Sequence, residues 1–217
     1  FKFVYMIGVF GGSFDPIHFG HINPLSDLSK QFNFSEIKLI PTYHSAVGKI
    51  FHADFEHRMN MVSIIAASET NNFIAEDIEI RKKGISYTYE TIKILKKDNK
   101  KEDICLIMGL DVFLNIETWY NYEKILEEVC ILVINRPGFE IKKINSMANL
   151  IRNKVSKSKS DFLKSEKKTI FFYQSPLIDI SSSSIRKIIE KDKDPVKKIP
   201  GSIMSYIKRN NLYKINE

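Results

Sequence analysis

Six short runs of consecutive apolar residues, separated by longer stretches with helical periodicity, most constrain what this chain can fold into. Continuous apolar runs are typical of strands in a parallel sheet that is covered on both faces. The predicted strands are Tyr5–Gly11, Glu36–Pro41, Phe73–Ala75, Asp103–Met108, Val129–Asn135 and Thr169–Tyr173. The predicted helices are His18–Gln31, Asp54–Ser68, Tyr89–Lys97, Trp119–Glu128, Ile141–Lys154, Ser182–Lys191 and Ser202–Asn210. This alternation predicts an α/β fold with a doubly wound, mostly parallel sheet, which binds ligands at the carboxyl ends of its strands.

The length of the chain favours one domain. With 217 residues, of which 43% are hydrophobic, the chain can bury one sizeable core, so we expect a single domain over residues 1–217. Residues 175–217 are expected to form a small C-terminal helical part of that domain. The Lys/Ser-rich stretch Ser156–Lys168 predicts a flexible excursion rather than a domain boundary. No apolar run approaches the roughly 20 residues that a membrane span needs, so no membrane partner is expected.

The cysteines and the net charge exclude some functions. Cys105 and Cys130 each lie inside an apolar run without a ligand-spaced partner, which indicates buried, reduced thiols of a cytoplasmic protein and no metal site. The formal charge of +7 fits either a nucleic acid or a site that collects phosphates. Much of the excess lies in residues 142–168 and 187–198, without interleaved aromatic residues. That pattern favours a solvated surface, and we expect no nucleic-acid partner.

The first predicted strand ends in a segment rich in glycine and histidine. Residues 11–21 read Gly-Gly-Ser-Phe-Asp-Pro-Ile-His-Phe-Gly-His, and a helical pattern follows. Gly11 and Gly12 let backbone amides approach a phosphate, and the helix start adds unpaired N–H groups and a partial positive charge. His18 and His21, three residues apart, share one face of the first helical turn and can point at the same anion. Gly20 leaves room for a nucleotide base to lie flat.

Alone, a glycine pair would indicate only a tight strand-to-helix turn, but the whole string resembles a known signature. Its His-x-Gly-His resembles the shared element of the nucleotidylyltransferase superfamily, and the longer form resembles the bacterial nicotinate mononucleotide adenylyltransferases in particular. The resemblance implies a Rossmann-like nucleotidylyltransferase fold. It also implies that His18 and His21 are catalytic residues that contact the ATP phosphates, with Gly11, Gly12 and Ser13 also binding ATP.

A second motif opens a predicted helix near the end of the chain. Residues 180–186 read Ile-Ser-Ser-Ser-Ser-Ile-Arg. Hydroxyl groups at a helix start can cap the backbone or donate to a phosphate, and the planar guanidinium of Arg186 suits phosphate oxygens. The alternative is a serine-rich cap followed by a surface arginine. The motif resembles the family's Ile-Ser-Ser-Thr-x-Ile-Arg, which implies that Ser182 and Ser183 bind ATP and that Arg186 is catalytic.

A third cluster follows the fourth predicted strand. Gly109 should lie at the ligand-facing edge of the sheet, Asp111 can accept from ribose hydroxyls or the adenine amine, and Trp119 offers a flat face for stacking. The alternative is a core tryptophan that anchors a helix. The segment resembles the family's Gly-x-Asp followed by Trp-Tyr. This implies that Gly109 and Asp111 hold the adenosine half of ATP and that Trp119 stacks on the pyridine ring, with Tyr120 beside it.

Two further segments match the family. Ser86-Tyr87-Thr88 indicates, taken alone, a helix start with a threonine cap, and it resembles a family Ser-Tyr-Thr. The resemblance implies that the backbone amides of Thr88 and Tyr120 bind the nicotinate carboxylate. Arg136, which opens an Arg-Pro-Gly, is implied to lie near ATP; the alternative is an arginine at an ordinary turn.

One segment departs from the family, which commonly has Pro-His-Lys or Pro-His-Arg in a loop over the phosphates. Residues 41–49 read Pro-Thr-Tyr-His-Ser-Ala-Val-Gly-Lys. Lys49 matches the basic residue and is a candidate phosphate contact, and His44 is a weaker candidate.

The resemblance implies transfer of AMP from ATP to nicotinate mononucleotide, with release of pyrophosphate and with Mg²⁺ carried by ATP. Backbone donors at the acceptor's carboxylate would favour nicotinate over nicotinamide mononucleotide. The alternatives within the superfamily are a pantetheine-phosphate adenylyltransferase and an adenylyltransferase that uses nicotinamide mononucleotide. The alternatives of other classes are a basic nucleic-acid-binding protein and a catalytically dead nucleotide sensor. A homo-oligomer is compatible with the sequence. All of this depends on residues 11–21 and 180–186 meeting at one triphosphate pocket.

Overall fold

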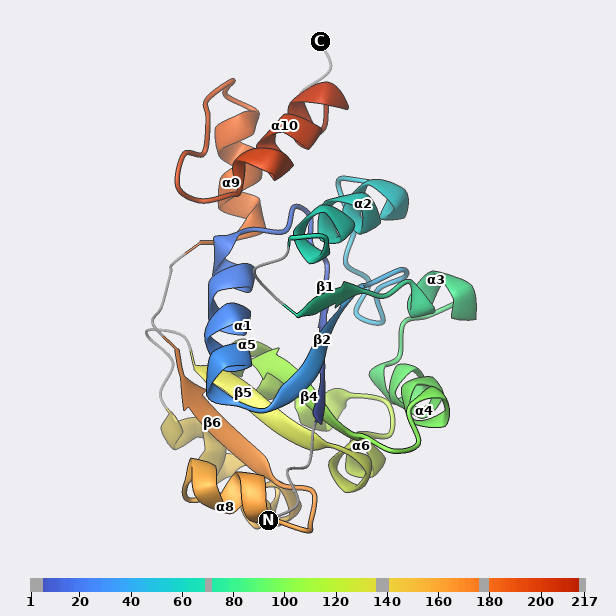
Figure 1. Cartoon of the computed structure of the whole chain (residues 1–217), viewed down its shortest axis with the longest axis vertical. Coiled ribbons are helices and arrows are strands. Elements are labelled where there is room, and N and C mark those ends of the chain that lie inside the picture. Colours follow the sequence, from blue (N-terminus) through green and yellow to red (C-terminus); the bar gives the residue numbers. More distant parts are fainter. Residues whose placement is uncertain (1–5, 69–71, 136–140, 176–179, 215–217) are drawn as a thin grey trace. The chain divides into compact units, whose positions relative to one another are not determined.

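A computed structural model describes residues 6–68, 72–135, 141–175 and 180–214 (Figure 1). Six strands form one sheet, in the order β3-β2-β1-β4-β5-β6, and every pair with a defined register runs parallel. The strands are β1 (Met6–Gly12), β2 (Phe34–Pro41), β3 (Phe73–Ala75), β4 (Asp103–Gly109), β5 (Cys130–Asn135) and β6 (Ile170–Gln174). The predicted α/β fold class and all six predicted strands are therefore confirmed.

The strand order determines where such a sheet binds ligands. β2 and β3 follow β1 on one side, whereas β4, β5 and β6 extend from its other side, so the order reverses at β1. In open parallel sheets the ligand lies outside the carboxyl ends of the strands at such a reversal. The carboxyl end of β1 carries Gly11 and Gly12, and that of β4 carries Gly109.

Helices flank the sheet, and most lie where the sequence predicts them. They are α1 (Phe19–Gln31), α2 (Phe55–Ala66), α3 (Ile78–Lys82), α4 (Thr88–Asp98), α5 (Leu110–Phe113), α6 (Tyr122–Glu128), α7 (Asn149–Arg152), α8 (Lys159–Lys164), α9 (Ser182–Ile189) and α10 (Gly201–Arg209). The helix predicted over Trp119–Glu128 begins only at Tyr122, because Asn121 has left-handed backbone angles, φ 55° and ψ 38°. The helix predicted over Ile141–Lys154 divides into a 3₁₀ segment, Ile141–Ser146, and the short α7.

The chain forms two compact units. Unit 1 comprises Phe1–Phe10, Asn33–Glu36 and Tyr87–Ser175, and unit 2 comprises Gly11–Phe32, Ile37–Ser86 and Pro176–Glu217. No helix within the described ranges is long and apolar enough to cross a membrane.

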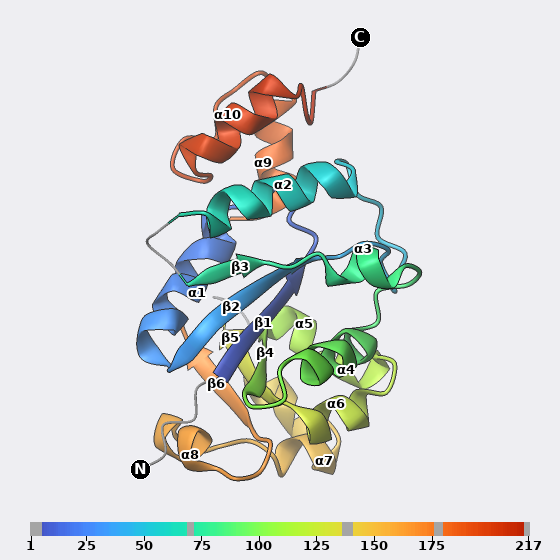
Figure 2. The ribbon, with the colours of Figure 1, turned by 45° about the vertical axis from the view of Figure 1, so that its right-hand side comes forward.

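The core of unit 1 is built on β4 and β5. Ile104 to Met108 of β4 and Ile131 to Ile134 of β5 are all buried, as expected for strands covered on both faces. α4 lies beside α6, and α8 packs on β6 (Figures 1 and 2). Phe162 of α8 is buried, and its ring lies 5.7 Å from that of Phe171. The expectation of a flexible excursion over Ser156–Lys168 is therefore wrong at α8, because one buried phenylalanine anchors that helix to the sheet.

Both cysteines lie in the core of unit 1, as predicted. Cys105 of β4 pairs in register with Cys130 of β5, and both are free and buried. Burial raises the pKa of each thiol above its usual value, since the charged thiolate loses its solvation there. Both side chains therefore stay as neutral thiols.

In unit 2 the C-terminal helices pack against the α2 region (Figures 1 and 2). The Tyr206 hydroxyl of α10 lies 3.0 Å from His57 Nδ1 and accepts a hydrogen bond from Asn60 Nδ2 at 3.0 Å. The predicted C-terminal helical part thus exists as α9 and α10.

Candidate active site

The loop after β1 is shaped by glycine and phenylalanine. Thr42 donates to the carbonyl oxygen of Gly12 through its backbone N–H, at 2.9 Å, and through its hydroxyl, at 3.3 Å. A Cβ at Gly12 would lie 3.1 Å from the ring of Phe14, which is fully buried, so that ring packs directly on the glycine backbone. Phe14 itself has a φ of 46°, which is uncommon for a bulky residue. The chain therefore turns sharply between Gly12 and the start of α1.

Asp15 organises this loop, a role that the sequence analysis did not assign. Its carboxylate is 2% exposed and accepts hydrogen bonds from the backbone N–H of His52, at 2.7 Å, and of Ala53, at 3.1 Å. The hydroxyl of Tyr213 donates to the same carboxylate at 2.8 Å. Because buried carboxylates need several donors, these contacts join three distant chain segments at one residue. Its burial and its partners depend on distant parts of the chain, so the local sequence gives no signal for this role.

Arg58 supports the same loop from α2 and was also missed. It is 1% exposed, donates to the carbonyl oxygens of Ser13, at 2.9 Å, and Ala53, at 3.1 Å, and lies 4.0 Å from the ring centre of Phe51. Burial lowers its pKa, an effect that the negative charge of Asp15 opposes. In the sequence Arg58 is one of many basic residues in helical patterns, so nothing local distinguishes it.

His18 and His21 lie together at the start of α1, as their spacing predicts. His18 is the N-terminal cap residue and is 2% exposed, whereas His21 is half-buried. Their rings stack with centroids 3.8 Å apart. The backbone N–H of His18 donates to Nδ1 of His21 at 3.3 Å. A neutral His21 ring that accepts at Nδ1 carries its proton on Nε2, which makes that nitrogen a donor.

Gly20 has a different role from the one predicted. A Cβ at this position would lie 2.9 Å from Cε1 and Nδ1 of His18 and 3.1 Å from the carbonyl oxygen of Ile180. The space is therefore taken by the His18 ring and by the backbone before α9, not left open for a base. Glycine is needed here because two parts of the protein approach its Cα closely.

The second motif meets the first one within unit 2. Ser181 caps α9, where its hydroxyl accepts from the Ser184 N–H at 3.2 Å and lies 3.1 Å from the Ser183 hydroxyl. The Ser182 hydroxyl donates to the carbonyl oxygen of Pro16 at 3.0 Å, and Arg186 Nη1 donates to that of Asp15 at 2.6 Å. Only 13% of the Arg186 side chain is exposed, which excludes an ordinary surface arginine. Residues 11–21 and residues 180–186 are therefore in direct contact, as predicted, and the triphosphate pocket between them stays a prediction.

Lys49 lies at the same loop although its surroundings depart from the family pattern. Its ammonium group donates to the Ser13 hydroxyl at 3.0 Å. His44 is exposed, and its ring is tilted by 34° against that of Tyr43, with centroids 4.1 Å apart. Its backbone N–H donates to Ser86 Oγ at 3.2 Å. Lys49 thus adds a positive charge at the loop that Arg186 also contacts. An anion is the ligand that such charges and a helix N-terminus favour.

The remaining predicted residues belong to unit 1. Gly109 ends β4 and caps α5, and Asp111 lies in the first turn of that helix, half-buried, with its carbonyl accepting from Asn115 at 2.9 Å. Trp119 follows the 3₁₀ segment Ile116–Thr118 and is only half-buried, so it is not a core tryptophan. Tyr120 is 51% exposed, and its ring lies 4.8 Å from that of Tyr87.

The start of α4 differs by one residue from the sequence-based interpretation of Thr88 as a helix cap. Tyr87 is the N-cap residue and Thr88 is the first helical residue, so the predicted threonine cap is wrong. The N–H groups of the first turn of a helix have no partner inside the helix. The amide of Thr88 can therefore donate to a ligand, as the family resemblance implies. Arg136 lies outside the described residues.

The described part of the chain contains no group of three or more His, Cys, Asp or Glu side chains that could hold a metal ion. The side chains at the loop after β1 are mostly nitrogen donors, whereas Mg²⁺ prefers oxygen ligands.

The sheet is parallel, and its first strand leads through a glycine-rich loop into a helix that begins with two histidines. These features define the class of nucleotide-binding α/β proteins. Comparison with known proteins places it more narrowly. The chain belongs to the cytidylyltransferase-like family, whose family model matches residues 9–188.

The relatives with sequence or structural similarity to this chain carry names of the same enzyme. The chain is 37% identical over 175 residues to a probable nicotinate-nucleotide adenylyltransferase of Aquifex aeolicus, covering 81% of this chain and 98% of the relative. It is 34% identical over 207 residues to the protein of the same name from Clostridium tetani, covering 95% and 98%. Among solved structures, a Plasmodium falciparum nicotinic acid mononucleotide adenylyltransferase complexed with NaAD matches with a TM-score of 0.73 and 25% identity, covering 96% of this chain and 97% of that one.

Proposed function

We propose that this chain is a nicotinate-nucleotide adenylyltransferase, which transfers AMP from ATP to nicotinate mononucleotide and releases pyrophosphate in the biosynthesis of NAD. The observation that carries the proposal is the contact of the α9 motif with the loop after β1. Arg186 and Ser182 bond to the carbonyl oxygens of Asp15 and Pro16, next to the two stacked histidines. The names of the two relatives, whose matches cover 81% and 95% of this chain, support the same reaction.

The reaction needs no nucleophile from the protein. A phosphate oxygen of nicotinate mononucleotide attacks the α-phosphorus of ATP, a new P–O bond forms, and the bond from the α-phosphorus to the bridging oxygen breaks. The electron pair of that bond leaves with pyrophosphate. Catalysis then consists of positioning and of stabilising the negative charge that develops on the oxygens.

The phosphate-binding residues have distinct roles. His18, His21 and Arg186 stabilise the charge on the α-phosphate and on the leaving pyrophosphate. Further hydrogen-bond donors come from the backbone amides of Gly12 and Ser13, next to Gly11. The start of α9, at Ser182 and Ser183, adds donors as well, and Lys49 adds a positive charge. ATP brings Mg²⁺ as part of the substrate, bound through phosphate oxygens and water. The Ser182 hydroxyl already donates to Pro16, so its contribution to ATP is the backbone N–H.

Residues of unit 1 recognise the two nucleosides. Trp119 stacks on the pyridine ring, and the amides of Thr88 and Tyr120 donate to the nicotinate carboxylate. Gly109 and Asp111 hold the adenosine half, and Arg136 lies near ATP. Backbone donors favour a carboxylate over a carboxamide, whose NH₂ group cannot accept from them. We therefore infer a preference for nicotinate over nicotinamide mononucleotide.

Several wider statements stay predictions. They are a single nucleotidylyltransferase domain over residues 1–217, a cytoplasmic location, and the absence of nucleic-acid and membrane partners. A homo-oligomer is compatible with them.

Pyrophosphate release in the presence of ATP and Mg²⁺ tests the function. Nicotinate mononucleotide, nicotinamide mononucleotide and phosphopantetheine are offered in parallel, and we expect the highest kcat/KM with the first. The variant His21→Ala should lower kcat about a hundredfold or more, as for loss of one transition-state donor, while the protein stays folded. His57→Ala, a histidine of α2 that bonds to Tyr206, is the matched control and should keep its turnover. Faster reaction with phosphopantetheine, or full turnover in His21→Ala, contradicts the proposal.

A further inference from the structure

The chain that follows α10 turns back toward the loop after β1. The N–H groups of Asn211 and Leu212 donate to the carbonyl oxygens of Lys208 and Ile207, at 3.3 and 3.1 Å, which forms a tight turn. Immediately beyond this turn, the Tyr213 hydroxyl donates to Asp15 Oδ1 at 2.8 Å. The two residues are 198 positions apart in the sequence. A single hydroxyl therefore joins the end of the described chain to the residue that organises the loop.

Both chain segments that meet at the Tyr213–Asp15 hydrogen bond contain a residue with unfavourable backbone angles. Tyr213 has a φ of 64° and Phe14, which precedes Asp15, has a φ of 46°. Left-handed angles cost bulky residues free energy and persist only where the surrounding contacts determine them, often at functional sites. Tyr213 is thus held in place by its contacts rather than by its own conformational preference.

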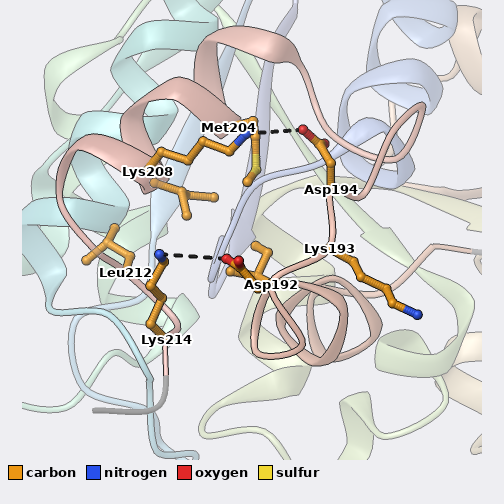
Figure 3. A pocket seen from close by; sticks show the side chains of 9 residues that line it. Asp192, Lys193, Asp194, Met204, Lys208, Leu212 and Lys214 are labelled. Carbon is orange, nitrogen blue, oxygen red and sulfur yellow. Dashed lines mark hydrogen bonds and ion pairs between the residues drawn. The ribbon is translucent and has the colours of Figure 1, made fainter. Parts of the chain in front are cut away.

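Other contacts hold the residues beside Tyr213. Leu212 and Lys214 line a cavity of about 400 Å³ in unit 2, together with residues of α9, of α10 and of the turn between them (Figure 3). Lys214 pairs with Asp192 at 3.8 Å, and Lys208 pairs with Asp194 at 3.3 Å. The neighbours of Tyr213 thus have contacts of their own: Leu212 lines the cavity, and Lys214 lines it and pairs with Asp192, while the Tyr213 hydroxyl reaches Asp15.

Asp15 connects Tyr213 to Arg186, because it accepts hydrogen bonds from both side chains. Its carboxylate binds Tyr213 together with the amides of His52 and Ala53, and its carbonyl oxygen binds Arg186 Nη1 at 2.6 Å. A shift of Asp15 therefore moves the acceptor that orients Arg186, and it also moves the turn that leads to His18. Positioning errors of about 1 Å can cost an enzyme about a hundredfold in rate.

We propose that Tyr213 is a positioning residue for adenylyl transfer, which fixes Asp15 and, through the Asp15 backbone, the guanidinium of Arg186. Its effect on turnover rests on the proposed function. The hydroxyl stays a donor at all physiological pH values, because burial and the Asp15 carboxylate raise the pKa of Tyr213 well above its ordinary value.

A tyrosine that only anchors the C-terminal segment would behave differently, and Tyr206 provides the comparison. Tyr206 joins α10 to α2 through His57 and Asn60, so it anchors the same segment through the same chemical group. In the described part of the chain its hydroxyl bonds to neither Asp15 nor Arg186. Tyr213→Phe and Tyr206→Phe each delete one hydroxyl from this segment, but only the first one removes a bond to the loop.

The experiment measures kcat, the KM for nicotinate mononucleotide, and the Kd for inorganic pyrophosphate with Mg²⁺ by calorimetry. Activities are referred to the folded fraction from circular dichroism, so that partial unfolding cannot imitate slow turnover. For Tyr213→Phe we expect kcat to fall about tenfold and the Kd for pyrophosphate to rise about tenfold, as for loss of a hydrogen bond to a charged group. The KM for nicotinate mononucleotide, which depends on residues of unit 1, should change by less than about twofold.

The outcomes separate the two proposals. Equal kcat and pyrophosphate affinity in Tyr213→Phe and Tyr206→Phe would overturn the positioning role of Tyr213. A wild-type protein that forms no dinucleotide, but in which Tyr213→Phe alone weakens pyrophosphate binding, would overturn the proposed function and keep the positioning role. A rise in the KM for nicotinate mononucleotide as large as the fall in kcat would indicate a general loss of structure and would also overturn the proposal.

Discussion

Replacing Gly20 by alanine tests how tightly the His18 ring is held. The added Cβ would lie 2.9 Å from two atoms of that ring and 3.1 Å from the carbonyl oxygen of Ile180. Ordinary contact begins at 3.4 Å, so the ring must move by about half an ångström. His18 is buried and stacked on His21 at 3.8 Å, and the other obstacle is backbone, so neither neighbour yields easily.

The expected cost follows from that displacement. An error of about 1 Å costs about a hundredfold in rate, so half of it should lower kcat about tenfold. Overpacking costs about 1–3 kcal/mol of stability, which the better helix propensity of alanine offsets by about 1 kcal/mol. We therefore expect a folded protein, less stable by about 0–2 kcal/mol, that turns over about tenfold more slowly.

Pyrophosphate release and urea unfolding measure these two effects. Gly201→Ala is the matched control, because the same methyl group at the start of α10 meets no atom within 4 Å. It should leave turnover unchanged. Gly20→Ala with the kcat of the wild type would refute the reasoning, since it would show that the His18 ring can move without consequence.

Three further outcomes are expected. Cys105 and Cys130 are buried with raised pKa values, so a thiol reagent should label them only after denaturation; fast labelling of the folded protein would contradict this. Arg58→Met should lower the free energy of unfolding by about 3–5 kcal/mol, because it removes two charged hydrogen bonds, to the buried carbonyl oxygen of Ala53 and to the half-buried one of Ser13. The same change at the exposed Arg152 should cost less than about 0.5 kcal/mol. Tyr213 has a pKa above its unfolded value of 10, so its contribution to stability is complete below pH 10 and is lost as the pH rises further. Melting temperatures should accordingly fall more steeply above pH 10 in the wild type than in Tyr213→Phe, and parallel curves would argue against the Tyr213–Asp15 bond.

Local patterns in the sequence were enough to predict the sheet. Runs such as Ile104 to Met108 are apolar on both faces, and such strands leave little choice but the centre of a parallel sheet. The spacing of His18 and His21 predicted their shared face, since positions three apart are neighbours in any helix. The contact of Arg186 with the loop after β1 was predicted from the family resemblance, because nothing in the residues near Arg186 names its partner.

The network around Asp15 could not be predicted in this way. Asp15, Arg58 and Tyr213 interact only through tertiary contacts, and a buried tyrosine or arginine has the same local pattern as an exposed one. The role of Gly20 was misread for a similar reason, since the group that needs the space belongs partly to Ile180. In α8, a single buried side chain, Phe162, outweighed a stretch whose composition favours irregular structure.

The hydrogen bond between Asp15 and Tyr213 has a consequence for biosynthesis. A ribosome produces the histidine-bearing helix early, but the partners of Asp15 and Pro16 in α9 and beyond emerge only after most of the protein has been translated. A nascent polypeptide therefore cannot assemble the phosphate-binding loop in its final form, and products of premature termination before Arg186 should neither capture nor consume cellular ATP.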